Sequence, residues 1–276
     1  MTKFLVLTDF SKNARHATEY AIQLAIQRKA RIQLIHVFEE PVPISESEPT
    51  MLHFQNMEQR IYQQLEERRG ELIQKYGDQV PITCHVYDRF LIERIQALFA
   101  RPEVKLAIIG LTGSGMSKFF LGSNTLDIVQ SSGCTVLTVP PQTVFRPIKK
   151  IVFAYNADDI PPSTIPINKI RKISEIFDAK LYILQVRPIT PPEEVIATNE
   201  IILTDLFKGI SNDLYSVKKK NIMAGIKDFA REKKADLIAI IPKKRDFWES
   251  LLRTNHTKVM LFRSDVPILS IPGENS

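Results

Sequence analysis

Residues 105–125 read KLAIIGLTGSGMSKFFLGSNT, and this stretch joins a strand pattern to a glycine-rich segment. The apolar run from Leu106 to Ile109 predicts a buried parallel strand. Four of the 10 glycines in the chain follow within 13 residues, at positions 110, 113, 115 and 122. Glycine at the carboxyl end of a strand lets backbone N–H groups approach an anion without a Cβ in the way. Two interpretations stay open: a phosphate-binding loop, or a tight turn into the next element.

The end of the same stretch favours the first interpretation. Gly122–Ser123 leads into residues 124–129, NTLDIV, which can begin a helix. The free N–H groups and the dipole at a helix N-terminus favour phosphate. Residues 110–115, GLTGSG, nevertheless match neither the dinucleotide-binding motif nor the P-loop motif.

An internal repeat organises the whole chain. Residues 150–155, KIVFAY, match residues 3–8, KFLVLT, 147 positions later, and residues 179–186 match residues 30–37 at an offset of 149. From the third strand onward the offset drops to 131. The difference predicts two copies of one unit, of which the second has a shorter second helix.

Strand and helix patterns alternate within each copy. This alternation predicts an α/β fold with two tandem open, mostly parallel five-stranded sheets and helices on both faces. We expect the first domain at residues 1–143 and the second at 148–273. In such sheets a ligand binds beyond the carboxyl ends of the strands, where the strand order reverses.

Asp9 follows the first strand at that end of the sheet. If the first strand lies beside the fourth, Asp9 and the loop at Gly110 face each other. The carboxylate of Asp9 could then accept a hydrogen bond from a ribose hydroxyl or an adenine amino group. The alternative is that Asp9 or Ser11 only caps the first helix.

Composition narrows the class of protein. The 276 residues carry a net charge of +6, and no apolar run is long enough for a transmembrane helix. The chain has two cysteines and no export signal, so we expect a cytoplasmic protein without a membrane partner. The basic clusters at 218–220 and 243–245 lack interleaved aromatic residues, which favours a solvated face over a nucleic-acid partner. The five histidines show no metal-ligand spacing, and we expect no metal site; His36, near the expected crevice, is the one that merits a test.

Taken together, these residues resemble the universal stress protein family in its tandem two-domain form. The family has an adenine nucleotide alpha hydrolase-like, Rossmann-like fold. Many members bind ATP through two glycines separated by two residues, then nine residues, then Gly–Ser or Gly–Thr. The backbone of the apolar residue that ends strand two contacts adenine. The resemblance implies that ATP or AMP, with or without Mg²⁺, binds at Asp9, Val37, Gly110, Gly113, Gly122, Ser123 and Asn124.

The chain departs from the family pattern in two places. Only eight residues separate Gly113 from Gly122, one fewer than the pattern has. In the second copy the loop is absent: Ile241 stands for Gly110, Arg253 for Gly122, and Asn156 for Asp9. We therefore expect no nucleotide of this kind in the second domain.

The resemblance leads to three candidate functions. The first is a cytoplasmic nucleotide-binding protein with a regulatory or stress-response role; no general base, arginine finger or Walker lysine surrounds the loop, so it would be at most a slow ATPase. The second is a nucleotide-free dimerisation or interaction scaffold, which the eight-residue spacing favours. The third is an adenylyltransferase or ATP pyrophosphatase, whose H-x-G-H and S-G-G-x-D-S signatures are absent. We also expect strands 134–139 and 266–271 to pair as an intramolecular pseudo-dimer, with a homodimer as a further possibility.

Overall fold

The computed structural model describes residues 2–38, 50–88, 92–110, 133–155, 161, 164–187, 193–219, 221–242 and 265–273. The chain divides into two compact units, Met1–Pro141 and Gln142–Ser276. Each unit is described by itself below. No helix in the described part of the chain is long and apolar enough to cross a membrane.

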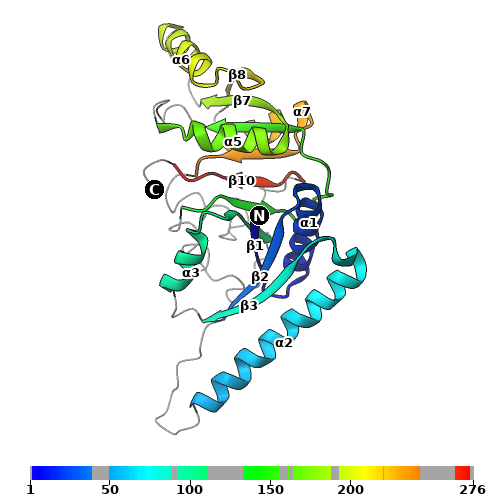
Figure 1. Cartoon of the computed structure of the whole chain (residues 1–276). Helices are drawn as coiled ribbons and strands as arrows, with labels where there is room; N and C mark the ends of the chain where they lie inside the picture. The colour runs from blue at the N-terminus through cyan, green and yellow to red at the C-terminus, as the bar shows by residue number, and fades with distance from the viewer. Residues whose placement is uncertain are drawn as a thin grey trace. The chain divides into compact units, whose positions relative to one another are not determined.

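Unit 1 is an open sheet of five parallel strands (Figure 1). Its strand order is β3-β2-β1-β4-β5, so β1 is flanked by β2 and β4. Helix α2 packs against one face, where the Cys84 thiol of β3 lies 3.4 Å from the Leu65 carbonyl oxygen, and α3 lies on the other face. In chain order the elements are β1 (Lys3–Leu7), α1 (Lys12–Arg28), β2 (Arg31–Phe38), α2 (Thr50–Tyr76), the 3₁₀ turn η1 (Gly77–Gln79), β3 (Ile82–Asp88), α3 (Ile92–Phe99), β4 (Val104–Gly110) and β5 (Val136–Val139).

Unit 2 repeats this arrangement of strands, with the order β8-β7-β6-β9-β10 and all described pairings parallel. Its second helix has 14 residues where α2 has 27, as the change of offset in the repeat predicts. Its elements are β6 (Lys150–Tyr155), α5 (Ile167–Phe177), β7 (Lys180–Arg187), α6 (Glu193–Leu206), β8 (Asn212–Lys218), α7 (Ile222–Lys233), β9 (Leu237–Ile240) and β10 (Ile268–Ser270). The predicted fold class, an α/β fold with parallel sheets covered by helices on both faces, is confirmed.

The central strand β1 forms the core of unit 1. Leu5, Val6 and Leu7 are all buried, because a strand with neighbours on both edges and helices on both faces has no solvated side. Helix α1 begins where Ser11 accepts a hydrogen bond from the Ala14 amide at 3.1 Å, which satisfies one of the free N–H groups of its first turn. The sequence therefore anchors the start of α1 directly beside the carboxyl end of β1.

Candidate functional site

The strand order of unit 1 reverses between β1 and β4, and this is where open α/β sheets bind ligands. The two strands pair in parallel register, with Val6 opposite Ile108. The arrangement that we expected if the first strand lay beside the fourth is therefore present. It brings the turn at Asp9 and the end of β4 at Gly110 to the same edge of the sheet.

Asp9 has one carboxylate oxygen with a hydrogen-bond donor and one without a donor among the described residues. The residue is 9% exposed, and Oδ1 accepts a hydrogen bond from the Ser11 amide at 2.9 Å. The Oδ2 atom is buried, and the part of the chain that the structure describes offers it no hydrogen-bond donor. Ser11, and not Asp9, caps α1. A buried carboxylate oxygen without a donor is costly, so this position favours any ligand group that can donate one.

Phe10, between these two residues, adopts the left-handed backbone region with φ of 63°. A residue with a Cβ prefers other regions, so the surrounding contacts must hold this conformation. The Phe10 amide donates to Thr8 Oγ1 at 3.1 Å, its carbonyl accepts from Arg15 Nε at 3.3 Å, and its ring stacks on His36 at 4.9 Å. Contacts from Thr8, Arg15 and His36 therefore hold the turn that carries Asp9.

His36 contributes a neutral ring to the same end of the sheet. Its Nδ1 lies 2.8 Å from the Thr8 carbonyl oxygen, which can only accept, so Nδ1 carries the proton. Burial lowers the pKa of His36, although the hydrogen bond to Thr8 and the charge of Asp9 both act to raise it. The ring thus ties the end of β2 to the end of β1.

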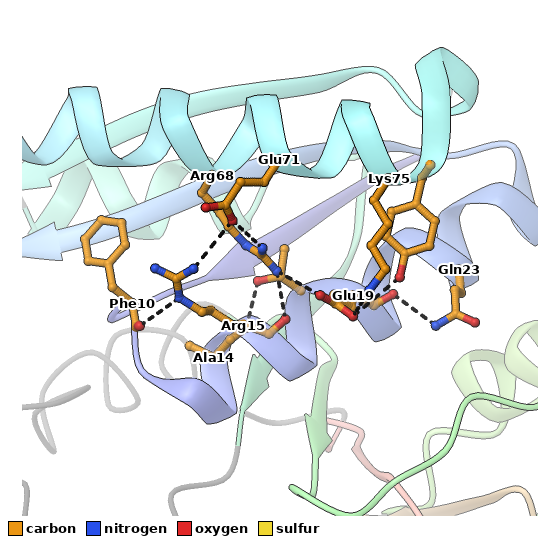
Figure 2. A network of polar contacts seen from close by, with 10 residues as sticks. Phe10, Ala14, Arg15, Glu19, Gln23, Arg68, Glu71 and Lys75 are labelled. Atoms are coloured by element: carbon orange, nitrogen blue, oxygen red, sulfur yellow. Dashed lines mark hydrogen bonds and ion pairs between the residues drawn. The ribbon is translucent and has the colours of Figure 1, made fainter.

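A polar network links this turn to α2 (Figure 2). Arg15, which bonds the Phe10 carbonyl, also lies 3.5 Å from Glu71 of α2. Arg68, whose side chain is only 11% exposed, bonds Glu71 at 2.7 Å and Glu19 of α1 at 3.3 Å. The network therefore holds α1 and α2 together beside the Asp9 turn.

Gly110 is explained by packing within unit 1. A Cβ at this position would lie 2.5 Å from the Asn13 carbonyl oxygen and 2.7 Å from the Asn13 carbonyl carbon. These are backbone atoms of the first turn of α1, so only glycine permits this close approach between α1 and β4. Contact between Gly110 and a ligand stays a prediction.

The other predicted site residues divide into two groups. Val37 lies next to the end of β2, opposite Tyr87 of β3, and is partly exposed. Four others, Gly113, Gly122, Ser123 and Asn124, lie outside the described residues. The structure thus brings Asp9, Val37 and Gly110 to the carboxyl edge of one sheet.

Larger side chains occupy the same strand positions in unit 2. Tyr155 and Gln185 are register partners at the ends of β6 and β7, and they are the repeat counterparts of Thr8 and His36. Tyr155 is 2% exposed, and its hydroxyl accepts a hydrogen bond from Gln185 Nε2 at 2.7 Å. Ile241, the counterpart of Gly110, is partly exposed just after β9. In unit 2 the larger Tyr155 thus replaces Thr8, and Gln185, which is hydrogen-bonded to Tyr155, replaces the ring of His36.

Sequence reasoning missed the residues that fix the Asp9 turn. Thr8, Phe10 and Arg15 carry no motif, and a left-handed conformation at a phenylalanine has no local sequence signal. The repeat could have identified Thr8, because the second copy changes it to the much larger Tyr155. The contact from Arg15 to the Phe10 carbonyl depends on tertiary structure and had no such signal.

Comparison with known proteins identifies the family. The model of the "Universal stress protein family" matches residues 1–140, which is more than half of the chain. The chain belongs to the universal stress protein family. No curated protein sequence matches it significantly.

Solved structures share the fold over the full length of this universal stress protein. A universal stress protein from Archaeoglobus fulgidus has 16% identity and a TM-score of 0.66, with 98% of each chain covered. A putative universal stress protein from Pseudomonas aeruginosa has 13% identity and a TM-score of 0.52, covering 100% of this chain and 94% of its own. The cytoplasmic domain of a prokaryotic cation chloride cotransporter has 11% identity and a TM-score of 0.51, covering 99% of this chain and 95% of its own. At these identities the likeness concerns the fold alone, and function must be argued from the site.

Proposed function

We propose that this universal stress protein binds an adenine nucleotide, ATP or AMP, with unit 1 only, and acts as a cytoplasmic regulatory protein in a stress response. The nucleotide lies at the carboxyl ends of β1, β2 and β4. The adenine meets the backbone at Val37, and the phosphates meet the segment from Gly110 to Asn124, in which Gly113, Gly122 and Ser123 supply main-chain and hydroxyl donors. Mg²⁺ accompanies the phosphates when ATP is bound.

The observation that carries this proposal is the buried Oδ2 of Asp9, which has no donor within the described ranges of the chain. A ribose hydroxyl or an adenine amino group is the kind of donor that this oxygen needs. The turn around it is held rigidly by Thr8, Arg15 and His36, so a ligand would meet an acceptor that is already oriented. Preorganised groups of this kind bind at a lower entropic cost.

The contrast with unit 2 supports the restriction to unit 1. At the corresponding strand ends, Gln185 donates a hydrogen bond to the Tyr155 hydroxyl, and neither of these two side chains carries a carboxylate. Pro242 follows Ile241 and lacks an N–H group for a phosphate oxygen. We therefore propose that unit 2 has a structural role.

We also propose that the last strands of the two units, β5 and β10, pair as an intramolecular pseudo-dimer. Edge strands carry unpaired backbone groups, and pairing would satisfy both sets. Crosslinking with mass spectrometry on the full chain tests this. Crosslinks between residues near strands 134–139 and 266–271 within one chain support the pairing, whereas crosslinks that occur only between chains favour a homodimer.

Mass spectrometry of ligand released from the purified full-length protein tests the nucleotide proposal. We expect wild type to retain or rebind an adenine nucleotide, and Gly122→Arg to lose it, because the new side chain stands where the backbone approaches phosphate. Arg253→Ala, at the corresponding sequence position of the second copy, is the matched control and should bind as wild type does.

Two results would reject the proposal. If wild type binds no adenine nucleotide at any concentration tested, the scaffold function is the better account. If Arg253→Ala loses the ligand and Gly122→Arg keeps it, the site lies in unit 2.

A further inference from the structure

The amino-terminal end of the unit 1 sheet carries a second cluster of charged residues, far from the nucleotide crevice. Lys3 of β1 and Arg31 of β2 are register partners at the starts of their strands. Arg101 lies in the turn before β4, and its carbonyl accepts from the Val104 amide at 2.9 Å. Lys3 and Asp9 are six residues apart along an extended chain, which corresponds to about 20 Å. This cluster and the crevice therefore lie at opposite ends of the strands.

The side chains of Lys3 and Arg31 share one face of the sheet. Side chains alternate between the two faces along a strand, and Cys84 points toward α2. Thr83 and His85 therefore project on the opposite face. Register partners on neighbouring strands point to the same face, so Gln33 of β2 shares the face of its partner Thr83. Arg31, two residues before Gln33, and its partner Lys3 therefore lie on that face as well. His85 is exposed there, with its ring stacked on Tyr87.

Positive charge in the cluster is not balanced. Glu103 is the one carboxylate, among the described residues, whose charge acts on Lys3, and it lies 3.9 Å from the Lys3 amine. The Lys3 side chain is 13% exposed, and the Nε of Arg31 is buried with no acceptor in the described part of the chain. Burial lowers the pKa of Lys3, and the charges of Arg31 and Arg101 lower it further, against the opposing effect of Glu103. Among the described residues Glu103 is thus the single counter-charge for three cations that repel one another.

The chemistry of this cluster fits a tetrahedral oxyanion. An oxyanion could accept from the terminal N–H groups of Arg31, which is partly exposed, and lie beside the Lys3 amine, because an arginine fork suits phosphate geometry. Three cations against one carboxylate match the charge of a phosphate dianion. We propose that Lys3, Arg31 and Arg101 form an anion site for inorganic phosphate or the phosphate of a small monoester, separate from the nucleotide crevice.

His85 reports on this site without belonging to it. Burial lowers the pKa of His85, and the charge of Lys3 lowers it further. An anion next to Lys3 would offset that charge and raise the pKa of His85. His36 lies at the other end of the strands, so its pKa should not respond and serves as an internal control.

The experiment is an NMR pH titration of His85 and His36 in the full-length protein, in sodium phosphate and in sodium chloride of equal ionic strength. We expect phosphate to raise the pKa of His85 and leave that of His36 unchanged. Lys3→Met and the exposed Arg101→Gln should each weaken the phosphate response about tenfold, the usual effect of losing one charged hydrogen bond. A parallel titration with phenyl phosphate separates the two sources: a response assigns the site to monoesters as well, and none assigns it to free phosphate.

Equal His85 titrations in phosphate and chloride would overturn the proposal, as would a phosphate response that survives in both variants. Arg101→Gln alters an exposed side chain, so it remains informative if Lys3→Met fails to fold. The result is independent of the nucleotide proposal, because ATP binding in the crevice can be measured on the same samples.

Discussion

Replacing Gly110 with alanine tests the close approach between α1 and β4 that shapes the candidate site. The added Cβ would lie 2.5 Å from the Asn13 carbonyl oxygen, whereas ordinary contact begins near 3.4 Å. The backbone of α1 or of β4 must therefore retreat by about 0.9 Å, because no flexible side chain is available to move. Overpacking of this kind costs about 3 kcal/mol.

Gly70→Ala is the matched control, because it adds the same methyl group with the opposite expected sign. Gly70 lies in α2, is exposed, and has no atom within 4 Å of the position of an added Cβ. Alanine in an exposed helix interior stabilises by about 1 kcal/mol relative to glycine. The two substitutions therefore separate a steric clash from the general effect of removing a glycine.

Differential scanning calorimetry of the full-length chain, without ligand, measures both variants. For a unit of this size, we expect Gly110→Ala to lower Tm by about 6–12 °C and Gly70→Ala to raise it by about 2–4 °C. If Gly110→Ala melts at or above the wild-type temperature while Gly70→Ala behaves as expected, the described packing of α1 on β4 is wrong. The glycine at 110 would then need a ligand-based explanation.

Three further predictions concern other parts of unit 1. Arg68→Met should lower the free energy of unfolding by about 2 kcal/mol, since it removes the mostly buried guanidinium from two partly solvated carboxylates. Arg69→Met, in a more exposed ion pair, should change the free energy of unfolding by less than about 0.5 kcal/mol. Urea denaturation measures both variants. Burial, with a smaller effect of the Glu66 charge, raises the pKa of Cys84 to about 12, so alkylation followed by mass spectrometry should label this thiol only after unfolding. Burial lowers the pKa of His36 in the folded protein below the ordinary value of 6.5. The contribution of the neutral His36 ring to stability is therefore complete above pH 6.5, and it is lost as the pH falls toward the lower pKa of the folded state. Tm should therefore fall less steeply from about pH 7 to about pH 5 in His36→Gln than in wild type, and equal slopes would show that His36 does not contribute.

The fold could be predicted because strand and helix patterns alternate and recur. The apolar runs that form β1 and β6 match each other along the chain. The smaller offset in the later part of the second copy reflects α6, which is shorter than its counterpart α2 in the first copy. The position of Asp9 at the carboxyl edge of the sheet also followed from the pattern, because parallel strands place all their carboxyl ends at one edge, whereas its place at the reversal of strand order was predicted only on the condition that β1 lies beside β4.

The detail of the site could not be predicted, because tertiary contacts decide it. Gly110 belongs to a sequence that suggests a phosphate loop, yet the backbone of Asn13 is sufficient to require glycine there. The left-handed Phe10 depends on Arg15 and His36, which are five and 26 residues away in the sequence. Neither contact has a periodic or compositional signal, so only the folded structure reveals it.

Isothermal titration calorimetry of the full-length protein with ATP tests the central claim most directly. The account predicts one nucleotide per chain, and an affinity about 10- to 100-fold weaker in Asp9→Ala, which removes a buried carboxylate oxygen that has no donor among the described residues. Glu67→Gln, an exposed change on α2, should bind as wild type does. Two nucleotides per chain, or an Asp9→Ala variant that binds ATP as tightly as wild type, would contradict it.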